Sequence, residues 1–132
     1  MSKQLVVLLV AGDGLTQLLT TSGLAIYGFE VLTARDGATA IEQLKTQRRI
    51  DVVVTDAELG GAVDGLAVAR IARELSPKIE VIYTARFPQK LPEKEKVRGA
   101  PCIRAPYHPH QIASVIAALK HRVTPDELGE VA

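Results

Sequence analysis

The sequence predicts an α/β fold built on a doubly wound parallel sheet, because short apolar runs alternate with segments of helical spacing. The apolar runs are 5–10, 29–32, 51–55, 79–83 and 102–104. The first and third runs are continuously apolar, which is typical of strands buried on both faces of a parallel sheet. Five strands alternating with five helices give right-handed crossovers and a site beyond the carboxyl ends of the strands.

Most of the helices are marked by apolar residues that recur at intervals of three and four. The four sets are Leu15, Leu18, Leu19 and Ile26; Ala40, Ile41 and Leu44; Val68, Ile71, Ala72 and Leu75; and Ile112, Val115, Ile116 and Leu119. Gly28 is a natural stop for the first helix, and Asp64 is well placed as the N-cap of the third. The segment 86–98 is interrupted by Pro88 and Pro92, which predicts a short or irregular helix there.

Length and composition limit the classes of function that are possible. The chain has 132 residues, and we expect one domain over residues 1–122 and a C-terminal tail over 123–132. A net charge of +1 gives no reason to expect nucleic acid or an anionic membrane as a partner. One cysteine allows no internal disulfide, and the apolar stretch at 5–10 is too short to span a membrane. We therefore expect a cytoplasmic protein.

The predicted site lies where the strands end, because parallel strands bring their carboxyl ends to one edge of the sheet. The residues at these ends are Ala11, Gly12 and Asp13, then Asp56, then Thr84 and Ala85, then Arg104, Ala105 and Pro106. Gly12-Asp-Gly14 lacks the Gly-Lys-Ser/Thr ending of a phosphate-binding loop. His108 and His110 have no further metal ligands evident beside them, and Glu93-Lys-Glu-Lys96 is interpreted as a solvated face.

These motifs, in this order and spacing, resemble bacterial response-regulator receiver domains over about Gln4 to Arg122. Asp51-Val-Val-Val-Thr-Asp56 resembles the third strand ending in the phosphoaccepting aspartate, and Leu59-Gly-Gly-Ala-Val-Asp-Gly65 resembles the loop after it. Val81-Ile-Tyr-Thr84-Ala85 resembles the fourth strand with its hydroxyl residue, and Gly99-Ala100 followed by Ala105-Pro106-Tyr107 resembles the approach to the Lys-Pro-aromatic turn. The resemblance implies a flavodoxin-like sheet in the strand order 2-1-3-4-5.

The sequence departs from this family at three places. Ala11 and Gly12 stand where the family has two acids that hold Mg²⁺, and Ala105 replaces the lysine before the proline. Cys102 stands where the family usually has an aromatic switch residue; we interpret it as a small buried apolar side chain rather than a redox sensor. The resemblance therefore implies a receiver whose phosphorylation chemistry is partly dismantled.

Little of that chemistry is expected to remain. Asp56 is a phosphoacceptor or a retained strand-end residue, and Thr84 is a switch or a β-branched strand end. Asp13 is interpreted as a helix cap, with metal binding as the less favoured role. No cofactor is expected. Mg²⁺, held by Asp56, Asp13 and the carbonyl of Glu58, would bind weakly because the acid pair is missing.

We therefore expect a single-domain pseudo-receiver that is not an enzyme, with no output domain in this chain, and that acts by binding other proteins. The resemblance implies a histidine kinase or another two-component protein as partner, and homodimerisation stays open. The implied contact surface contains Leu91, Val97, Arg104, Tyr107 and the exposed side of 108–122. One alternative is a weak but genuine phosphoacceptor at Asp56. Another, an enzyme on this sheet, has no nucleophile–base pair to support it.

Overall fold

The computed structural model describes residues 4–47 and 49–120 of the chain. One sheet of five parallel strands forms its centre, in the order β2-β1-β3-β4-β5. The strands are β1 (Val6–Val10), β2 (Glu30–Ala34), β3 (Val52–Asp56), β4 (Glu80–Ala85) and β5 (Cys102–Arg104). The predicted sheet and its strand order are confirmed. The expected tail at 123–132 lies outside the described residues.

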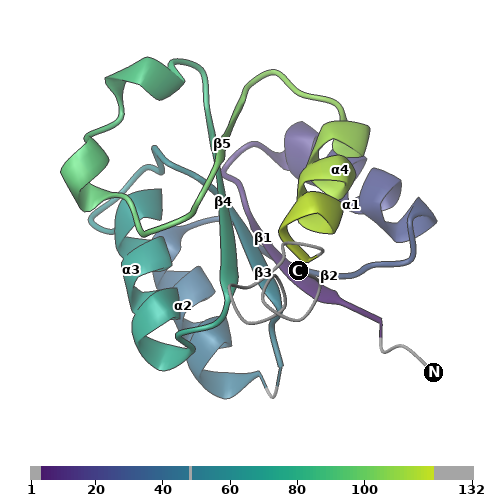
Figure 1. The fold of residues 1–132 in the computed structure, drawn as a ribbon, viewed down its shortest axis with the longest axis horizontal. Coiled ribbons are helices and arrows are strands. Elements are labelled where there is room, and N and C mark those ends of the chain that lie inside the picture. The colour runs from purple at the N-terminus through teal and green to yellow at the C-terminus, as the bar shows by residue number, and fades with distance from the viewer. Residues whose placement is uncertain (1–3, 48, 121–132) are drawn as a thin grey trace, which may run out of the picture.

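The helices form two layers on the two faces of the sheet (Figure 1). The layer of α2 (Gly37–Thr46) and α3 (Gly65–Leu75) covers one face, and the layer of α1 (Gly14–Ile26) and α4 (Pro109–Lys120) covers the other. Over the described residues, none of these helices is both long enough and apolar enough to cross a membrane.

Three helices begin at an aspartate whose side chain accepts a hydrogen bond from the backbone N–H three residues later. These caps are Asp13, Asp36 and Asp64, at 2.9, 2.7 and 2.9 Å from the N–H groups of Thr16, Thr39 and Ala67. Each cap satisfies one of the donors that the first turn of a helix leaves unpaired. The predicted cap at Asp64 and the capping role of Asp13 are confirmed.

The segment 86–98 forms two 3-10 turns instead of a fifth α-helix. They are η1 (Pro88–Lys90) and η2 (Glu93–Glu95). Prolines at positions 88 and 92 remove amide donors that an α-helix would need, so the predicted irregularity is confirmed. Two side chains hold the end of the segment. The Tyr83 hydroxyl accepts from the N–H of Val97 at 3.0 Å, and Arg73 Nη1 donates to the carbonyl of Arg98 at 2.8 Å.

The central strands β1, β3 and β4 are buried on both faces, which divides the core into two clusters. The cluster under α2 and α3 is built on Leu8, Val53 and Val81, and it takes Leu66, Val68, Ala69 and Ala72 from α3. The cluster under α1 and α4 is built on Val7, Val54 and Ile82, and it takes Ile112, Ala113 and Ile116 from α4. From α1 it takes only Leu24.

The apolar residues that mark α1 in the sequence point away from the sheet. Leu15, Leu18, Leu19 and Ile26 are 64%, 63%, 57% and 84% exposed. The buried residues of α1 are Thr20 and Leu24. The helix is therefore correctly predicted, but its apolar side lies on the surface. Leu75, at the end of α3, is likewise half exposed.

Candidate functional site

The centre of the predicted site is set by the register of β3 and β4. Asp56, the last residue of β3, lies opposite Thr84 of β4. The Thr84 hydroxyl donates a hydrogen bond to Asp56 Oδ1. The backbone ties the same two positions together, because the N–H of Ala57 donates to the carbonyl of Thr84 at 2.9 Å. The structure thus brings the predicted phosphoacceptor and the predicted switch residue into direct contact.

Asp56 lies in an environment that disfavours its charged form. Burial raises the pKa of its carboxyl group. Hydrogen bonds from the Thr84 hydroxyl and the Gly12 N–H lower the pKa in part, and the negative charge of Asp13 raises it further. Both donors to the carboxylate are neutral groups of the protein itself.

Asp13 is engaged differently. Its Oδ2 accepts from the N–H of Thr16 at 2.9 Å and from the hydroxyl of Thr16 at 2.5 Å. These bonds, with the nearby charge of Arg35, lower the pKa of this exposed carboxyl group. The Asp13 side chain therefore caps α1, which is the role that the sequence favoured over metal binding.

Ala11, Gly12 and Ala105 bring no charged side chain to the site. Ala11 is buried, and its N–H donates to the carbonyl of Ala34 at 3.1 Å. Ala105 donates its N–H to the carbonyl of Ala85 at 2.8 Å. A Cβ added at Gly12 would have only the Arg35 carbonyl nearby, at 3.7 Å, so a side chain fits there.

A cleft of 820 Å³ opens over these residues. Asp13, Asp56, Glu58, Thr84, Ala105 and Tyr107, which the sequence pointed to, all line it. Leu19, Thr16, Thr20, Arg86 and Phe87 also line it. Sequence reasoning missed this second set, because those residues come from the side of α1 and from the start of an irregular segment. The only signal for Arg86 and Phe87 was their place just after the fourth apolar run.

Divalent-metal chemistry finds little support in this donor set. Magnesium requires several oxygen ligands in near-octahedral geometry, usually including one or two carboxylates. Here Asp13 Oδ2 accepts both cap bonds from Thr16 and Asp56 Oδ1 accepts from Thr84, while Ala11 and Gly12 add no carboxylate. Among the described residues, no group of three or more His, Cys, Asp or Glu side chains could hold a metal ion.

Two residues of the implied contact surface differ in accessibility. Arg104 is exposed at the end of β5. Tyr107 is half-buried, and its hydroxyl lies 3.1 Å from that of Thr20 on α1.

Cys102 is only half-buried, so the expectation of a buried side chain is wrong in degree. Burial still raises the pKa of its thiol.

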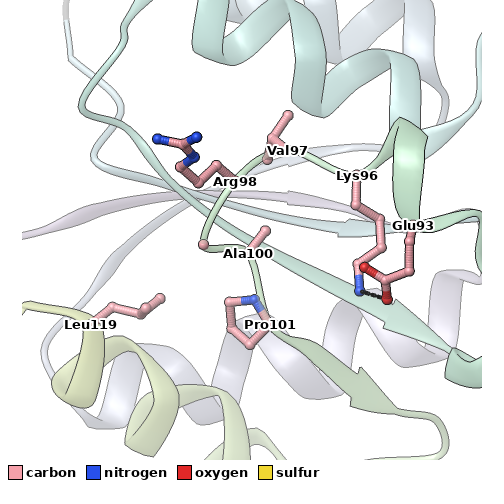
Figure 2. A pocket seen from close by; sticks show the side chains of 8 residues that line it. Glu93, Lys96, Val97, Arg98, Ala100, Pro101 and Leu119 are labelled. Carbon is pink, nitrogen blue, oxygen red and sulfur yellow. Dashed lines mark hydrogen bonds and ion pairs between the residues drawn. The ribbon is translucent and has the colours of Figure 1, made fainter.

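Two other residues of the implied contact surface pack against the core. Leu91 and Val97 pack against the cluster under α2 and α3. A second hollow of 580 Å³, lined in part by Val97, lies between the 93–101 segment and Leu119 of α4 (Figure 2). The ion pair between Lys96 and Glu93, 3.3 Å long, lies on its wall. This hollow contains none of the residues around Asp56.

Comparison with known proteins agrees with this geometry. Residues 7–100 match the family model of the response regulator receiver domain. A response regulator receiver protein from Sinorhizobium medicae WSM419 is 30% identical, with a TM-score of 0.82 over 89% of this chain and 94% of that chain. Chemotaxis response regulator CheY4 of Vibrio cholerae is 22% identical, with a TM-score of 0.76 over 89% and 99%.

A CheY-like receiver domain protein from Methanospirillum hungatei JF-1 is 18% identical, with a TM-score of 0.77 over 89% of this chain and 95% of that chain. No curated protein sequence matches this chain. The family model spans most of the sheet and includes Asp56 and Thr84. By its fold, its strand order and this match, the chain belongs to the family of response-regulator receiver domains of two-component signal transduction.

Proposed function

We propose that this receiver acts mainly by binding a partner protein in one fixed state, and not through a rapid cycle of phosphorylation at Asp56. The observation that carries the proposal is the hydrogen bond from Thr84 to Asp56. In a switching receiver, a hydroxyl at this position would respond to a phosphoryl group by moving inward. Here the hydroxyl already contacts the carboxylate, so this element of the switch has little further to move.

The charges around Asp56 support the same proposal. Transfer of a phosphoryl group to a carboxylate depends on positioning and on cations that neutralise the developing charge. Receiver domains commonly bind Mg²⁺ at this site, but Ala11, Gly12 and Ala105 provide neither the acid pair nor the fixed lysine. Loss of one preorganised group typically lowers a rate by about 10²–10³. Mg²⁺ binding is proposed to be weak, and no cofactor is required.

Labelling with acetyl phosphate tests this directly. The wild-type protein should label slowly, and the triple variant Ala11→Asp/Gly12→Asp/Ala105→Lys should label at least about 100-fold faster. The matched control is the same triple variant with Asp56→Asn, which should not label. Equal rates for the wild-type and triple-variant proteins would show that the natural site is already competent.

The second candidate function is a weak phosphoacceptor for a histidine kinase. It is favoured by one observation, the position of Asp56 on the wall of an 820 Å³ cleft that small phosphodonors can enter. Titration with Mg²⁺, followed by amide chemical shifts, separates the two candidates. Saturation below millimolar metal, centred on Asp56, would favour the phosphoacceptor.

Receiver domains interact with histidine kinases and other signalling proteins, and we propose that this protein binds a partner of that kind. We also propose that it acts in the cytoplasm and has no enzymatic activity of its own. Arg104 and Tyr107 are the proposed contact residues. Arg104→Ala should weaken binding to an identified partner, measured by calorimetry, while Asp56→Asn should leave the affinity nearly unchanged. Tyr107→Phe keeps the half-buried ring and removes only the hydroxyl that faces Thr20, so it probes the Tyr107 contact without leaving a cavity. If Asp56→Asn abolishes binding, the fixed-state proposal fails.

A further inference from the structure

The outward side of α1 is more apolar than its inward side. Six exposed residues share it, at intervals of three and four: Leu15, Leu18, Leu19, Ser22, Ala25 and Ile26. The side turned toward the sheet carries Thr20, Thr21 and Leu24, and the buried hydroxyl of Thr21 has no hydrogen-bond partner among the described residues. A surface helix normally turns its apolar stripe to the core. In α1 this arrangement is reversed.

Such a face is unfavourable in water, because burying exposed apolar surface lowers the free energy. Soluble monomers rarely expose large contiguous apolar patches, and such patches mark contact sites. The apolar surface continues past the end of α1 at Tyr27, which is half exposed. Its hydroxyl lies 3.1 Å from Nδ1 of His110, so it links the end of α1 to the start of α4.

The absence of charge on this face favours a second copy of the chain as the occupant. None of the thirteen residues of α1 is acidic or basic. Neighbouring α4 carries one lysine, Lys120 at its last position, while His110, Gln111 and Ser114 are polar and exposed. A different protein is usually selected by complementary charges across the interface. In a symmetric dimer each surface meets itself, so a face without charges avoids like-charge contacts.

The distribution of side-chain size suits an antiparallel pair. The large residues Leu15, Leu18 and Leu19 occupy the N-terminal half of the outward side, whereas Ser22 and Ala25 leave the following turn shallow. In an antiparallel arrangement, Leu18 and Leu19 of one copy lie over the small residues of the other, and large residues interdigitate with small ones. The helix dipoles also run in opposite directions, which is the favourable orientation.

We propose that the protein forms a two-fold symmetric homodimer in which the α1 helices of two copies pack antiparallel. Leu15 of one copy lies near Ile26 of the other, and Leu19 near Ser22. An α1 helix of about 20 Å by 10 Å is narrow for the roughly 800 Å² that each partner contributes to a stable interface. The exposed start of α4 therefore forms the polar rim. The dimer goes beyond the proposed function and does not depend on the state of Asp56.

Sedimentation equilibrium of the full chain tests the proposal. The wild-type protein should show a concentration-dependent dimer, and Leu18→Gln/Ile26→Gln should raise its dissociation constant at least about tenfold, since the pair places two amides in an apolar contact. Leu75→Gln on α3 is the matched control, because Leu75 is a comparable half-exposed residue in the other layer. It should leave the dimer unchanged, as should Asp56→Asn.

A cross-link tests the antiparallel orientation. In a Cys102→Ala background, Ser22→Cys lies close to the proposed two-fold axis and should form a covalent dimer under mild oxidation, whereas Leu75→Cys should not. A wild-type chain that stays monomeric at millimolar concentration overturns the proposal, even if α1 binds a different protein. So does a dimer that Leu18→Gln/Ile26→Gln leaves intact, or one that cross-links through position 75 instead of position 22.

Discussion

The layer of α2 and α3 and the layer of α1 and α4 cover opposite faces of one sheet, but they use their apolar residues differently. Helix α3 turns Leu66, Val68, Ala69 and Ala72 inward, and two of its three charged residues, Arg70 and Glu74, are exposed. Helix α1 contributes Leu24 to the core and exposes three leucines and an isoleucine. The difference teaches that helical spacing identifies an apolar stripe but not what the stripe contacts.

The largest effect is expected where α1 does reach the core. Leu24 is fully buried, so Leu24→Ala should lower the free energy of unfolding by about 2–5 kcal/mol through lost burial and the cavity left behind. Urea denaturation measures this change. A loss below about 1 kcal/mol would mean that α1 packs only weakly on the sheet. The two layers would then differ more in packing than the structure indicates.

A smaller effect is expected where α1 packs on α4. A Cβ added at Gly23 would overlap the ring of Pro109. Gly23→Ala should therefore cost about 1–3 kcal/mol, as overpacking typically does, unless the helices separate. Gly60→Ala is the matched control, because an added Cβ there meets nothing within 4 Å. Its unfolding free energy should change little, and chemical denaturation of both variants makes the comparison.

The carboxyl-terminal ends of the strands lie between the two layers. At Asp56, which ends β3, the expected effect on stability depends on pH. The raised pKa of Asp56 means that the folded protein holds this proton more tightly than the unfolded chain does. Wild-type stability should therefore fall as pH rises from near 4 through the folded pKa, by about 1.4 kcal/mol for each unit by which the pKa is raised. Asp56→Asn lacks this loss.

The difference between the two proteins isolates Asp56. The unfolding free energy of Asp56→Asn should exceed that of the wild-type protein at pH 7, and the gap should close below pH 4. Urea denaturation at pH 3.5, 5 and 7 measures it. The lowered pKa of Asp13 acts in the opposite direction in both proteins and cancels in the comparison. A gap that widened as the pH falls would contradict the assigned environment of Asp56.

The smallest effect is expected on the outward side of α1. Leu18 is 63% exposed, so Leu18→Ala should change the unfolding free energy of the monomer by no more than about 0.5 kcal/mol. The measurement is made at the lowest workable protein concentration, because dimerisation would add its own stabilisation. A loss of several kcal/mol would mean that Leu18 packs on the core, which would remove the contrast between the layers.

The strands could be predicted from sequence because buried parallel strands leave a strong local signal. Val52, Val53 and Val54 are β-branched and fully buried, so composition alone identifies β3. Prolines 88 and 92 likewise predicted the irregular segment. The orientation of α1 could not be predicted, because Leu15, Leu18 and Leu19 have the same spacing whether they face the sheet or the solvent.

The candidate site was predictable in part for the same reason. Asp56 and Thr84 end apolar runs, and parallel topology brings such ends together. Arg86 and Phe87 follow β4 in a segment without periodicity, so only the folded chain shows that they line the cleft. The hydroxyl of the half-buried Tyr107 contacts Thr20 on a helix far away in the sequence, and a contact between residues so far apart leaves no local pattern.

The two 3-10 turns of 86–98 have a consequence for local opening of the fold. An α-helix protects its amide protons with a continuous ladder of hydrogen bonds, whereas η1 and η2 supply only isolated ones, such as Lys90 N–H to the Phe87 carbonyl at 2.9 Å. Segments with few internal hydrogen bonds exchange their amide protons through small openings that do not require global unfolding. The amide of Val97, held by Tyr83, should exchange more slowly than those of 88–95. This stretch borders the cleft at Phe87, so we expect the segment beside the site to open at a low free-energy cost while the sheet stays closed.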